Sequence, residues 1–515
     1  MTYAVGIDLG TTNSAVSVFR RGVVETLPVE GRSVMPSVIS FRDDGSVLVG
    51  QPAKSRLLLD PENTIASAKR FMGDRSKVYP VTGGRSITPV DVGSLVLKQL
   101  INNARKALGE DIWDAVITVP AYFTEAQRED TKRAGEEAGL NVLRLIPEPT
   151  AAAIAYGLDK GRDQTLMVYD LGGGTFDVSI LEVKGNSFNV KAVGGNSRLG
   201  GDDFDHAIMV WAAEQFQAQT GVDLLHDPSR AGIVARQRLK ETAEAAKIEL
   251  SQSSYAVLAI PDCLGHPLEQ ELSLTQYNEL IAPFLHQTVD YMKAVLADAK
   301  LTADNIDRVI LVGGSTKNRA VQEVVAAAIK EPYTSERVDE VVSHGAAILA
   351  AGLSTPDLID IQVNDVTAHS LGVDMLVQDN ITFIPIIPRQ TQYPCRQGVL
   401  GFTLRPMQKE VVMRVYRGES SKPEENDYRG ELSLPVLPPQ RGIVPLAAIF
   451  TLDSDGIIDF TAVQLPTDAC STPILNYASE HDSGLDLPAI DALVKSNQAK
   501  TKSIKVVSGE ANQQK

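Results

Sequence analysis

Apolar and polar residues follow two different patterns along this chain. Up to about residue 355, short apolar runs alternate with segments of helical spacing. Residues 115–119 precede a helix predicted near 125–138, and residues 309–312 precede one near 319–329. Strands that alternate with helices are typical of a sheet covered by helices. The sequence therefore predicts an α/β fold for this part of the chain.

One sequence motif occurs twice within the α/β region, at residues 5–14 and 168–177. In each copy an apolar strand ends on an aspartate, turns through glycine and threonine, and leaves as a second apolar strand. Each copy predicts a β-hairpin with a carboxylate at its mouth. The repeat implies two related halves, beginning near Tyr3 and Thr165, with a ligand site between them.

The tips of these hairpins have the chemistry of a phosphate site. Glycine lets backbone N–H groups approach a ligand closely, and clustered N–H groups and threonine hydroxyls bind anions. The aspartates, Asp8 and Asp170, suit a hydrated Mg²⁺ better than the anion itself. Either copy alone could be an ordinary tight hairpin, but the matched pair predicts a site that binds a Mg²⁺-polyphosphate from both sides. No GxxxxGK[ST] motif occurs, which excludes a P-loop.

After Thr355 the pattern changes. The sequence becomes rich in proline, lacks helical spacing, and contains short alternating runs such as residues 411–416. Asp455-Gly456 lies between two apolar runs and is a strong hairpin signal. These features predict an antiparallel β-sandwich. The predicted boundaries are 1–356 for the α/β domain, 357–366 for a linker, 367–476 for the sandwich, and 477–515 for a short helix and a disordered polar tail.

Composition narrows the class of protein. With 515 residues, 43% of them hydrophobic, the chain can form several cores. Its net charge of −16 disfavours non-specific binding to nucleic acid or anionic lipid. The three cysteines, Cys263, Cys395 and Cys470, are too widely spaced to suggest a disulfide framework or a zinc site. With no signal-peptide pattern and no apolar run of about twenty residues, we expect a cytoplasmic protein. We also expect it to be a monomer.

Seven motifs, in order along the chain, resemble those of the DnaK-type seventy-kilodalton heat-shock chaperones. The resemblance extends from Tyr3 to about Tyr477, and the motifs are residues 8–14, 117–123, 148–152, 170–177, 199–204, 312–316 and 345–347. It implies a two-lobed actin-like ATPase domain that binds ATP or ADP with Mg²⁺, and K⁺ as a further candidate ion. It also implies a β-sandwich that binds extended apolar segments of unfolded or client polypeptides, followed by a vestigial helical C-terminus.

The resemblance assigns roles to single residues. Lys69 matches the lysine that contacts the γ-phosphate and the attacking water, and Glu148 would position that water. Asp8 and Asp170 would hold Mg²⁺ through water, and Asp177 would support the second hairpin. Hydrolysis would then rest on positioning and electrostatics. The implied catalytic set is Lys69, Glu148, Asp170, Thr175 and Asp177, and the implied ATP contacts are Gly10, Thr11, Thr12, Asn13, Gly172, Gly173, Gly174, Gly200, Gly201, Glu244, Lys247, Ser251, Gly313, Gly314, Ser315 and Lys317.

Two of these assignments depend strongly on the resemblance. Glu244, Lys247 and Ser251 share one face of a helix predicted at residues 237–250, which by pattern alone is typical of a solvated surface helix. The strand-Gly-Gly-helix junction at Gly313 and Gly314 is also a common packing device. Lys317 stands where the family usually has an arginine over the adenine ring. Because lysine stacks less well on a flat ring, we expect weaker nucleotide binding.

Further residues match the family's relay and peptide site. Pro120 and Arg128 match residues that transmit the nucleotide state, although a proline that ends a strand and an arginine that faces solvent would have the same pattern. Val411 matches the central peptide pocket, and alternating apolar residues in a sandwich can equally be core. The implied peptide-binding set is Val373, Leu376, Leu404, Val411 and Met413.

Three departures from the family pattern alter the expectations. The linker reads Ile361-Gln362-Val363-Asn364-Asp365, and its two polar residues predict weaker docking on the ATPase domain. Pro147 replaces an asparagine on the surface that would bind a J-domain partner, where Arg144, Thr150 and Asp365 remain. The sequence after Leu485 predicts one helix in place of a long lid, so peptide exchange would be fast.

The leading hypothesis is an ATP-hydrolysing chaperone with slow turnover and a narrow range of clients. An alternative is a nucleotide-switched binding module in which peptide does not stimulate hydrolysis. An actin-fold small-molecule kinase and a filament-forming actin relative share the paired hairpins, since fold does not fix function. Neither of these two classes accounts for the carboxy-terminal sandwich.

Overall fold

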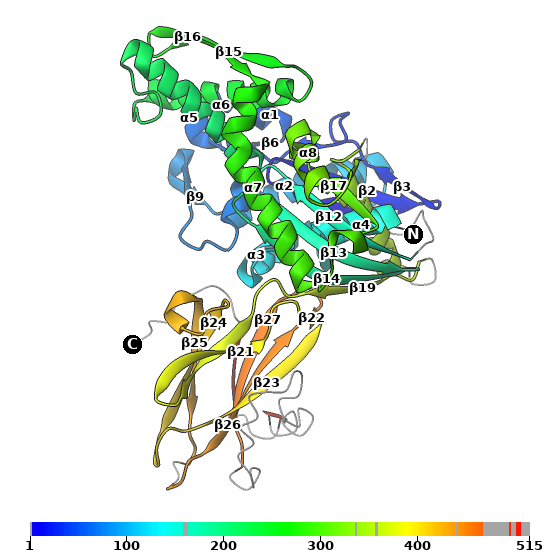
Figure 1. The fold of residues 1–515 in the computed structure, drawn as a ribbon, viewed down its shortest axis with the longest axis vertical. Coiled ribbons are helices and arrows are strands. Elements are labelled where there is room, and N and C mark those ends of the chain that lie inside the picture. Colours follow the sequence, from blue (N-terminus) through cyan, green and yellow to red (C-terminus); the bar gives the residue numbers. More distant parts are fainter. Residues whose placement is uncertain are drawn as a thin grey trace. The chain divides into compact units, whose positions relative to one another are not determined.

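The computed structural model describes residues 3–157, 163–334, 337–355, 359–438, 441–466, 494–495 and 501–505 (Figure 1). They form two compact units. The first unit comprises Met1–Phe123 and Asp130–Asn364, and the second comprises Thr124–Glu129 and Asp365–Lys515. In the described part of the chain, no helix is both long and apolar enough to cross a membrane.

The first unit contains two sheets of the same topology. One has the order β11-β10-β1-β2-β3 and the other β18-β17-β12-β13-β14, so each has a central hairpin with parallel strands on one side and an antiparallel strand on the other. This correspondence confirms the predicted duplication. The strands are β1 (Val5–Asp8), β2 (Asn13–Arg20), β3 (Val23–Thr26), β10 (Asp114–Val119), β11 (Asn141–Pro147), β12 (Gln164–Leu171), β13 (Phe176–Lys184), β14 (Ser187–Asn196), β17 (Arg308–Val312) and β18 (Tyr333–Thr334).

Two helices join these halves. Helix α4 (Glu148–Gly157) follows the first sheet but packs on β12 and β13 of the second, whereas α9 (Val341–Ser354) follows the second sheet but packs on β1 and β2 of the first. The two helices also pack on each other. They approach closely because Gly345 lies against the carbonyl of Ala151. Each half therefore covers a sheet of the other.

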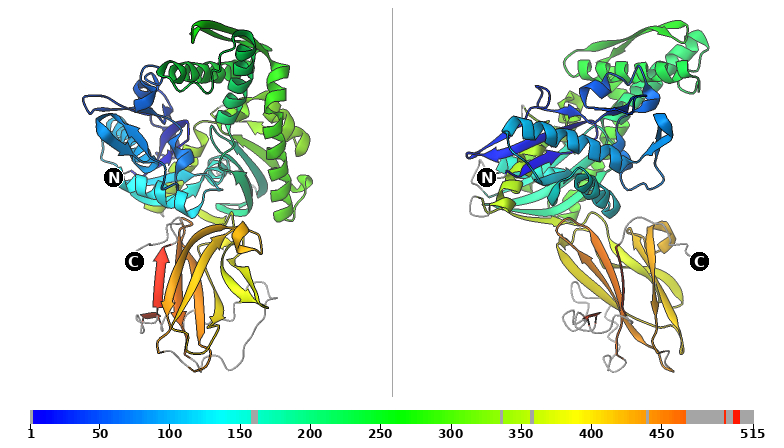
Figure 2. Two further views of the ribbon diagram at one scale, coloured as in Figure 1. Left: turned by 90° about the vertical axis from the view of Figure 1, so that its left-hand side faces the viewer. Right: turned by 180° about the vertical axis from the view of Figure 1, so that it is seen from behind.

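The other helices cover the outer faces of the two sheets and form the outer lobes. Figures 1 and 2 show α7 lying along the second sheet, where it packs on β13 and β14. Helix α2 begins with a capping box at Thr88 and ends at Gly109, which has a positive φ of 70°. The helices are α1 (Gln51–Lys54), α2 (Pro89–Leu108), α3 (Glu125–Glu137), α5 (Gly201–Thr220), α6 (Arg230–Leu250), α7 (Leu274–Asp298) and α8 (Arg319–Ala328).

The remaining short strands belong to the outer parts of this unit. Strand β4 pairs with β2, and β5, β6 and β7 form a small sheet. Two separate hairpins, β8-β9 and β15-β16, complete the set. Their bounds are β4 (Met35–Pro36), β5 (Ile39–Phe41), β6 (Val47–Val49), β7 (Thr64–Ile65), β8 (Tyr79–Val81), β9 (Arg85–Ile87), β15 (Tyr255–Cys263) and β16 (His266–Ser273).

The predicted linker contributes a strand, β19 (Gln362–Val366). Its first three residues pair in parallel with β14, and the Asn364 side chain donates a hydrogen bond of 2.8 Å to Asn189 Oδ1. We predicted that polar residues would weaken this docking. Asn364 contributes one hydrogen bond to the contact, and the weaker docking stays a prediction.

The second unit is the predicted β-sandwich. Its sheets have the orders β21-β20-β24-β25 and β23-β26-β27-β28, and one apolar core contains residues of both (Figure 2). Asp455-Gly456 lies in the turn between β26 and β27, as the sequence predicted. The bounds are β20 (Leu371–Val377), β21 (Asn380–Ile387), β22 (Gln392–Tyr393), β23 (Cys395–Phe402), β24 (Glu410–Arg417), β25 (Asp427–Pro435), β26 (Pro445–Leu452), β27 (Ile458–Gln464) and β28 (Thr501–Lys505).

The C-terminal segment corrects one expectation. Residues 501–505, predicted as part of a disordered tail, form β28 and pair antiparallel with β27. Because β27 and β28 are far apart in the sequence, no local pattern predicts that they pair. Apart from residues 494–495, which are helical, the helix predicted after Leu485 lies outside the described residues.

The contact between α4 and α9 predicts the effect of a substitution. A Cβ at position 345 would lie 1.7 Å from the Ala151 carbonyl oxygen, so Gly345→Ala must push two buried helices apart. We expect the free energy of unfolding of the first unit to fall by about 1–3 kcal/mol, as overpacking does elsewhere. Urea unfolding measures it.

Gly442→Ala is the matched control because a Cβ there would have no neighbour within 4 Å. This control should leave the unfolding transition of the first unit unchanged. Equal stability of Gly345→Ala and the natural protein would contradict the close packing of α4 on α9.

Candidate nucleotide site

The tips of the two predicted hairpins meet. A Cβ on Gly173, in the second hairpin, would lie 2.0 Å from Thr12 Oγ1 in the first. A Cβ on Gly10 would lie 2.0 Å from the carbonyl oxygen of Asn13. No other residue type fits at either position without moving backbone or side chain. Gly10 therefore allows the tight turn of the first tip, and Gly173 allows the two tips to come together at one side of a cavity.

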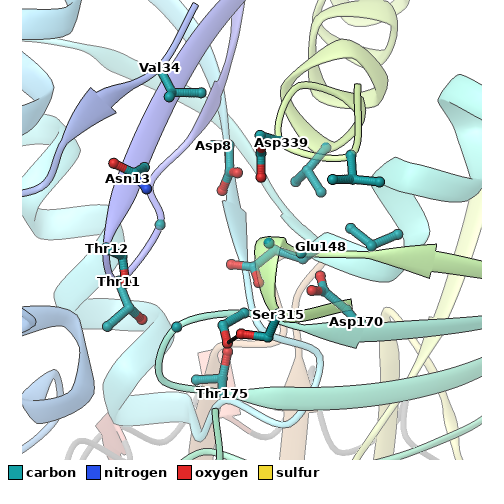
Figure 3. A pocket seen from close by; sticks show the side chains of 18 of the residues that line it. Asp8, Thr11, Thr12, Asn13, Val34, Glu148, Asp170, Thr175, Ser315 and Asp339 are labelled. Carbon is teal, nitrogen blue, oxygen red and sulfur yellow. Dashed lines mark hydrogen bonds between the residues drawn. The ribbon is translucent and has the colours of Figure 1, made fainter. Parts of the chain in front are cut away.

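That cavity has a volume of about 340 Å³. Figure 3 shows Thr11, Thr12 and Asn13 on one side of it and the carboxylates of Asp8, Glu148 and Asp170 pointing into it from other elements. It is lined by Asp8, Gly10, Thr11, Thr12, Asn13, Val34, Lys69, Glu148, Asp170, Gly172, Gly173, Thr175, Glu244, Lys247, Ile248, Val312, Gly313, Gly314, Ser315, Lys317, Val338, Asp339 and Val342.

One buried ion pair lies at the centre of the lining. Lys69 Nζ is 2.5 Å from Glu148 Oε1, and both residues are less than one-tenth exposed. Lys69 lies in a short 3-10 helix that follows Ser67, whereas Glu148 is the first residue of α4. The pair thus joins segments far apart in the sequence within the same wall of the cavity.

The same wall contains more acid than base. Asp8 ends β1 and accepts a hydrogen bond of 3.0 Å from Thr118 Oγ1, and Asp170 lies near the end of β12. Burial, with repulsion from Glu148, raises the pKa of Asp8 to about 7. Burial, followed by repulsion from Glu148, Asp177 and Asp8, raises the pKa of Asp170 well above its usual range. A bound cation would relieve this repulsion.

Asp177 supports the second hairpin from outside the cavity lining. It pairs with Asp170 across β12 and β13, and its Oδ1 accepts a hydrogen bond of 2.8 Å from the backbone N–H of Tyr122. Tyr122 follows Pro120 in the turn after β10, a strand of the first sheet. Asp177 therefore connects the second hairpin to the first half.

A further side of the cavity comes from α6 and the junction after β17. Lys247 Nζ lies 2.8 Å from Asp205 and donates a hydrogen bond of 3.2 Å to the carbonyl of Gly201. Ser315 Oγ donates to the carbonyl of Gly172 at 2.9 Å. The Lys247 contacts join α6 to the start of α5, and the Ser315 bond joins the junction after β17 to the second hairpin. Burial raises the pKa of Asp205 to about 6 despite the adjacent Lys247.

The donor set suits Mg²⁺ bound together with a polyphosphate. Among the described residues, no group of three or more His, Cys, Asp or Glu side chains could hold a metal ion. Asp8 and Asp170 are nonetheless two oxygen donors beside glycine- and threonine-rich tips, and Mg²⁺ in proteins usually keeps several waters and uses one or two carboxylates plus phosphate oxygens. The raised carboxyl pKa values are the observation that favours a cation here.

Comparison with known proteins identifies the family. The family model described as "Hsp70 protein" matches residues 4–81 and 74–514. The chain is 44% identical over 477 residues to "Chaperone protein DnaK" of Thermotoga petrophila, covering 90% of this chain and 78% of that protein. It is 43% identical over 497 residues to the protein of the same name from Thermus thermophilus, covering 91% and 79%.

This chain belongs to the Hsp70 family. Family membership agrees with the duplicated α/β unit and the β-sandwich, and it makes the cavity between the paired hairpins the candidate nucleotide site. Hsp70 proteins bind ATP or ADP with Mg²⁺, which matches the donor set of this cavity.

Most residues predicted for the Hsp70 nucleotide site line one cavity. Five predicted residues do not line it: Gly174, Asp177, Gly200, Gly201 and Ser251. Gly200 and Gly201 begin α5, and the N–H groups of Gly201 and Asp202 donate to the carbonyls of Gly172 and Gly173. Ser251 is half-buried after the end of α6, where its hydroxyl donates to the carbonyl of Ile248. These five remain predictions for direct or indirect roles.

The predicted site residues omit part of the lining, namely Val34, Ile248, Val312, Val338, Asp339 and Val342. Ile248 could have been found, because it is an apolar residue one turn after Glu244 on a polar helix. In the structure it is 59% exposed. Asp339 carries no local signal. Its carboxylate lies 2.6 Å from Lys317 Nζ, so the lysine predicted to lie over the adenine already has an exposed partner.

The predicted peptide-binding residues fall into two groups within the sandwich. Val373 and Met413 are buried in its core, and Val411 is partly buried against that core. Leu376 and Leu404 are 48% and 69% exposed. Val411 and Met413 therefore point to the inner face of β24, while the two leucines are accessible. A peptide site here stays a prediction.

The predicted relay and partner residues do not line the nucleotide cavity. Pro120 follows β10, and Arg128 lies in the first turns of α3. Arg144 is half-buried on β11, and Asp365, on β19, pairs with Tyr393. Thr150 and Asp365 were expected at the J-domain surface, and for both residues this expectation is wrong, because they are 1% and 2% exposed. Thr150 is buried because α4 is packed against both α9 and the second sheet.

The raised pKa of Asp8 predicts how stability depends on pH. The folded protein holds a proton on Asp8 up to about pH 7, whereas the unfolded chain releases it near 3.8. Without metal or nucleotide, Asp8 therefore lowers the free energy of unfolding as pH rises from about 4 to 7, by at most about 1.4 kcal/mol per pH unit. Asp8→Asn removes this dependence and should be more stable than the natural protein at pH 8.

Urea unfolding at pH 5 to 8 in the presence of a chelator measures the difference between the two proteins. Asp379→Asn, at an exposed carboxylate, is the control and should follow the natural protein. If Asp8→Asn and the natural protein lose stability in parallel, Asp8 is not protonated in the folded state near neutral pH.

Proposed function

We propose that this Hsp70-family chain is an ATP-dependent chaperone, which hydrolyses ATP to ADP and phosphate and binds extended apolar segments of client polypeptides. The observation that carries the proposal is the buried Lys69–Glu148 pair beside two facing hairpins. The relatives named "Chaperone protein DnaK" support it, since they match the chain through both units. Nothing in the site favours a kinase or a filament-forming protein.

The chain's own residues would perform hydrolysis by positioning and electrostatics. The hairpin N–H groups and the hydroxyls of Thr11, Thr12 and Thr175 would hold the phosphates. Glu148 would orient the attacking water, and Lys69 would stabilise charge that develops on the transferred phosphoryl group. Asp8 and Asp170 would hold Mg²⁺ through water. The bound ion would supply charge neutralisation between the phosphate oxygens and these carboxylates.

Several finer statements belong to this proposal. We expect slow turnover, as the family resemblance implies. K⁺ is a further candidate ion, a J-domain protein is a candidate partner, and a cytoplasmic monomer is the expected form. The peptide would lie against Val411, with Leu376 and Leu404 reaching over it from two exposed positions.

Removal of the Lys69 ammonium tests the catalytic assignment. Lys69→Ala should lower kcat for ATP hydrolysis at least a hundredfold, a loss of about 2.7 kcal/mol of transition-state stabilisation. Single-turnover hydrolysis with Mg²⁺ measures it, and a fluorescent ADP analogue reports whether nucleotide still binds. Lys77→Ala, which changes a lysine outside the cavity lining, is the matched control. Undiminished turnover in Lys69→Ala would refute the role of Lys69.

Pairing of the linker with β14 predicts nucleotide-dependent coupling. Asn364→Ala removes the hydrogen bond to Asn189 and should weaken docking of residues 362–364. We expect faster proteolysis in the linker and smaller stimulation of the ATPase by an apolar peptide, each by about two- to fivefold for one lost amide bond. Asn380→Ala is an exposed control. Identical cleavage with ADP and with ATP in the natural protein would indicate an uncoupled binding module.

A further inference from the structure

Two neighbouring loops of the sandwich form one surface. Residues 403–409 connect β23 to β24, and residues 436–444 connect β25 to β26. The N–H of Thr403 donates to the carbonyl of Val444 at 3.0 Å, and the N–H of Val436 donates to the carbonyl of Lys409 at 2.8 Å. Thr403 and Val444 are buried. Both ends of the pair of loops are therefore fixed to each other and to the core.

This surface, which we call the basic rim, exposes large apolar side chains. Leu404 is 69% exposed, Met407 54%, Ile443 56% and Leu437 40%. Single exposed apolar residues are ordinary on a protein surface, but a group on two bonded loops indicates a binding surface.

The basic rim also has one sign of charge. Arg405, Lys409 and Arg441 are exposed, and the described residues of the two loops include no Asp or Glu. None of the three cations forms an ion pair with another described residue, whereas Arg414 lies 3.0 Å from Asp374 and Lys422 lies 2.7 Å from Glu425 elsewhere in the sandwich. In a chain with a net charge of −16, three unpaired cations beside apolar groups are an unusual concentration.

The nearest acid in the sequence, Glu410, forms no ion pair with the described cations of the rim. Glu410 begins β24, and its carboxylate accepts a hydrogen bond from the Ser433 hydroxyl on β25. Val411, the predicted pocket residue, follows at once, and Leu404 is predicted to reach over the peptide. The rim therefore adjoins the predicted peptide site, and its cations would face residues that flank the apolar core of a bound segment.

We propose that the basic rim selects client segments in which Asp or Glu flanks a short apolar core. This inference rests on the proposed peptide-binding function and names its substrate class. Apolar client residues contact Leu404, Met407, Leu437 and Ile443, and flanking carboxylates pair with the three cations. Because these pairs are exposed, their contribution is modest and depends on salt.

Three matched fluorescent peptides test the proposal on the full chain. They share a leucine-rich core and differ in flanks of Glu, Gln or Lys. At 50 mM salt the Glu-flanked peptide should bind about fivefold more tightly than the Gln-flanked one, and the Lys-flanked peptide about fivefold more weakly. The Lys-to-Glu ratio of Kd values should approach one at 500 mM salt, and also in Arg405→Gln/Lys409→Gln. Lys422→Gln, at an ion-paired lysine beyond the other end of β24, should keep the ratio.

The outcomes separate this proposal from the function on which it rests. If the Gln-flanked peptide does not bind, the peptide-binding function itself fails. If it binds but the flanks make no difference, or Lys flanks are preferred, the rim is not a selector of acidic clients. Binding to phosphatidylserine vesicles that Arg405→Gln/Lys409→Gln abolishes, without any peptide preference, would assign the rim to a lipid surface and overturn the proposal.

Discussion

Repulsion among buried carboxylates is the constraint on which the first unit depends. Asp8, Glu148 and Asp170 share a cavity wall with one ammonium, that of Lys69, and burial makes the excess negative charge costly. Removing charge from water is expensive unless it is paired, so this arrangement persists only because the surrounding structure holds it. Burial raises the pKa of Asp8 and of Asp170, which favours protons on these two carboxyls and avoids part of the cost, and a cation would replace those protons.

The interlocked halves provide that rigid surrounding. Asp8 comes from the first sheet and Asp170 from the second, while Glu148 lies on α4, which leaves the first sheet and packs on the second. Gly345 lets α9 lie directly against α4, and Gly173 lets the two hairpin tips touch. Movement of one half relative to the other must therefore change the distances between the carboxylates. Cation and phosphate binding is thereby tied to the relative position of the halves.

Features with a local pattern could be predicted from the sequence, and those made by distant contacts could not. The two hairpins, the strand-helix alternation and the sandwich follow from residue periodicity and turn chemistry, and the structure confirms them. Asp339 and Val342 enter the cavity at the start of α9 because of how that helix packs, which no motif encodes. Thr150 was misplaced because a helix of small apolar residues gives no sign of which side faces solvent. Strand β28 was missed because its partner, β27, lies far away in the sequence.

The nucleotide cavity and the basic rim differ in how strongly solvent and salt screen their charges, and this difference fits their proposed roles. The carboxylates of the nucleotide cavity are buried, so salt screens them little, and each change of protonation or bound cation has a large effect. The cations of the basic rim are exposed, so each pair contributes little and no single one decides binding. Binding at the cavity would then depend strongly on one ligand, whereas the rim would bind many related segments with modest differences in affinity. A chaperone requires both: a strict response to its nucleotide and a tolerant response to its clients.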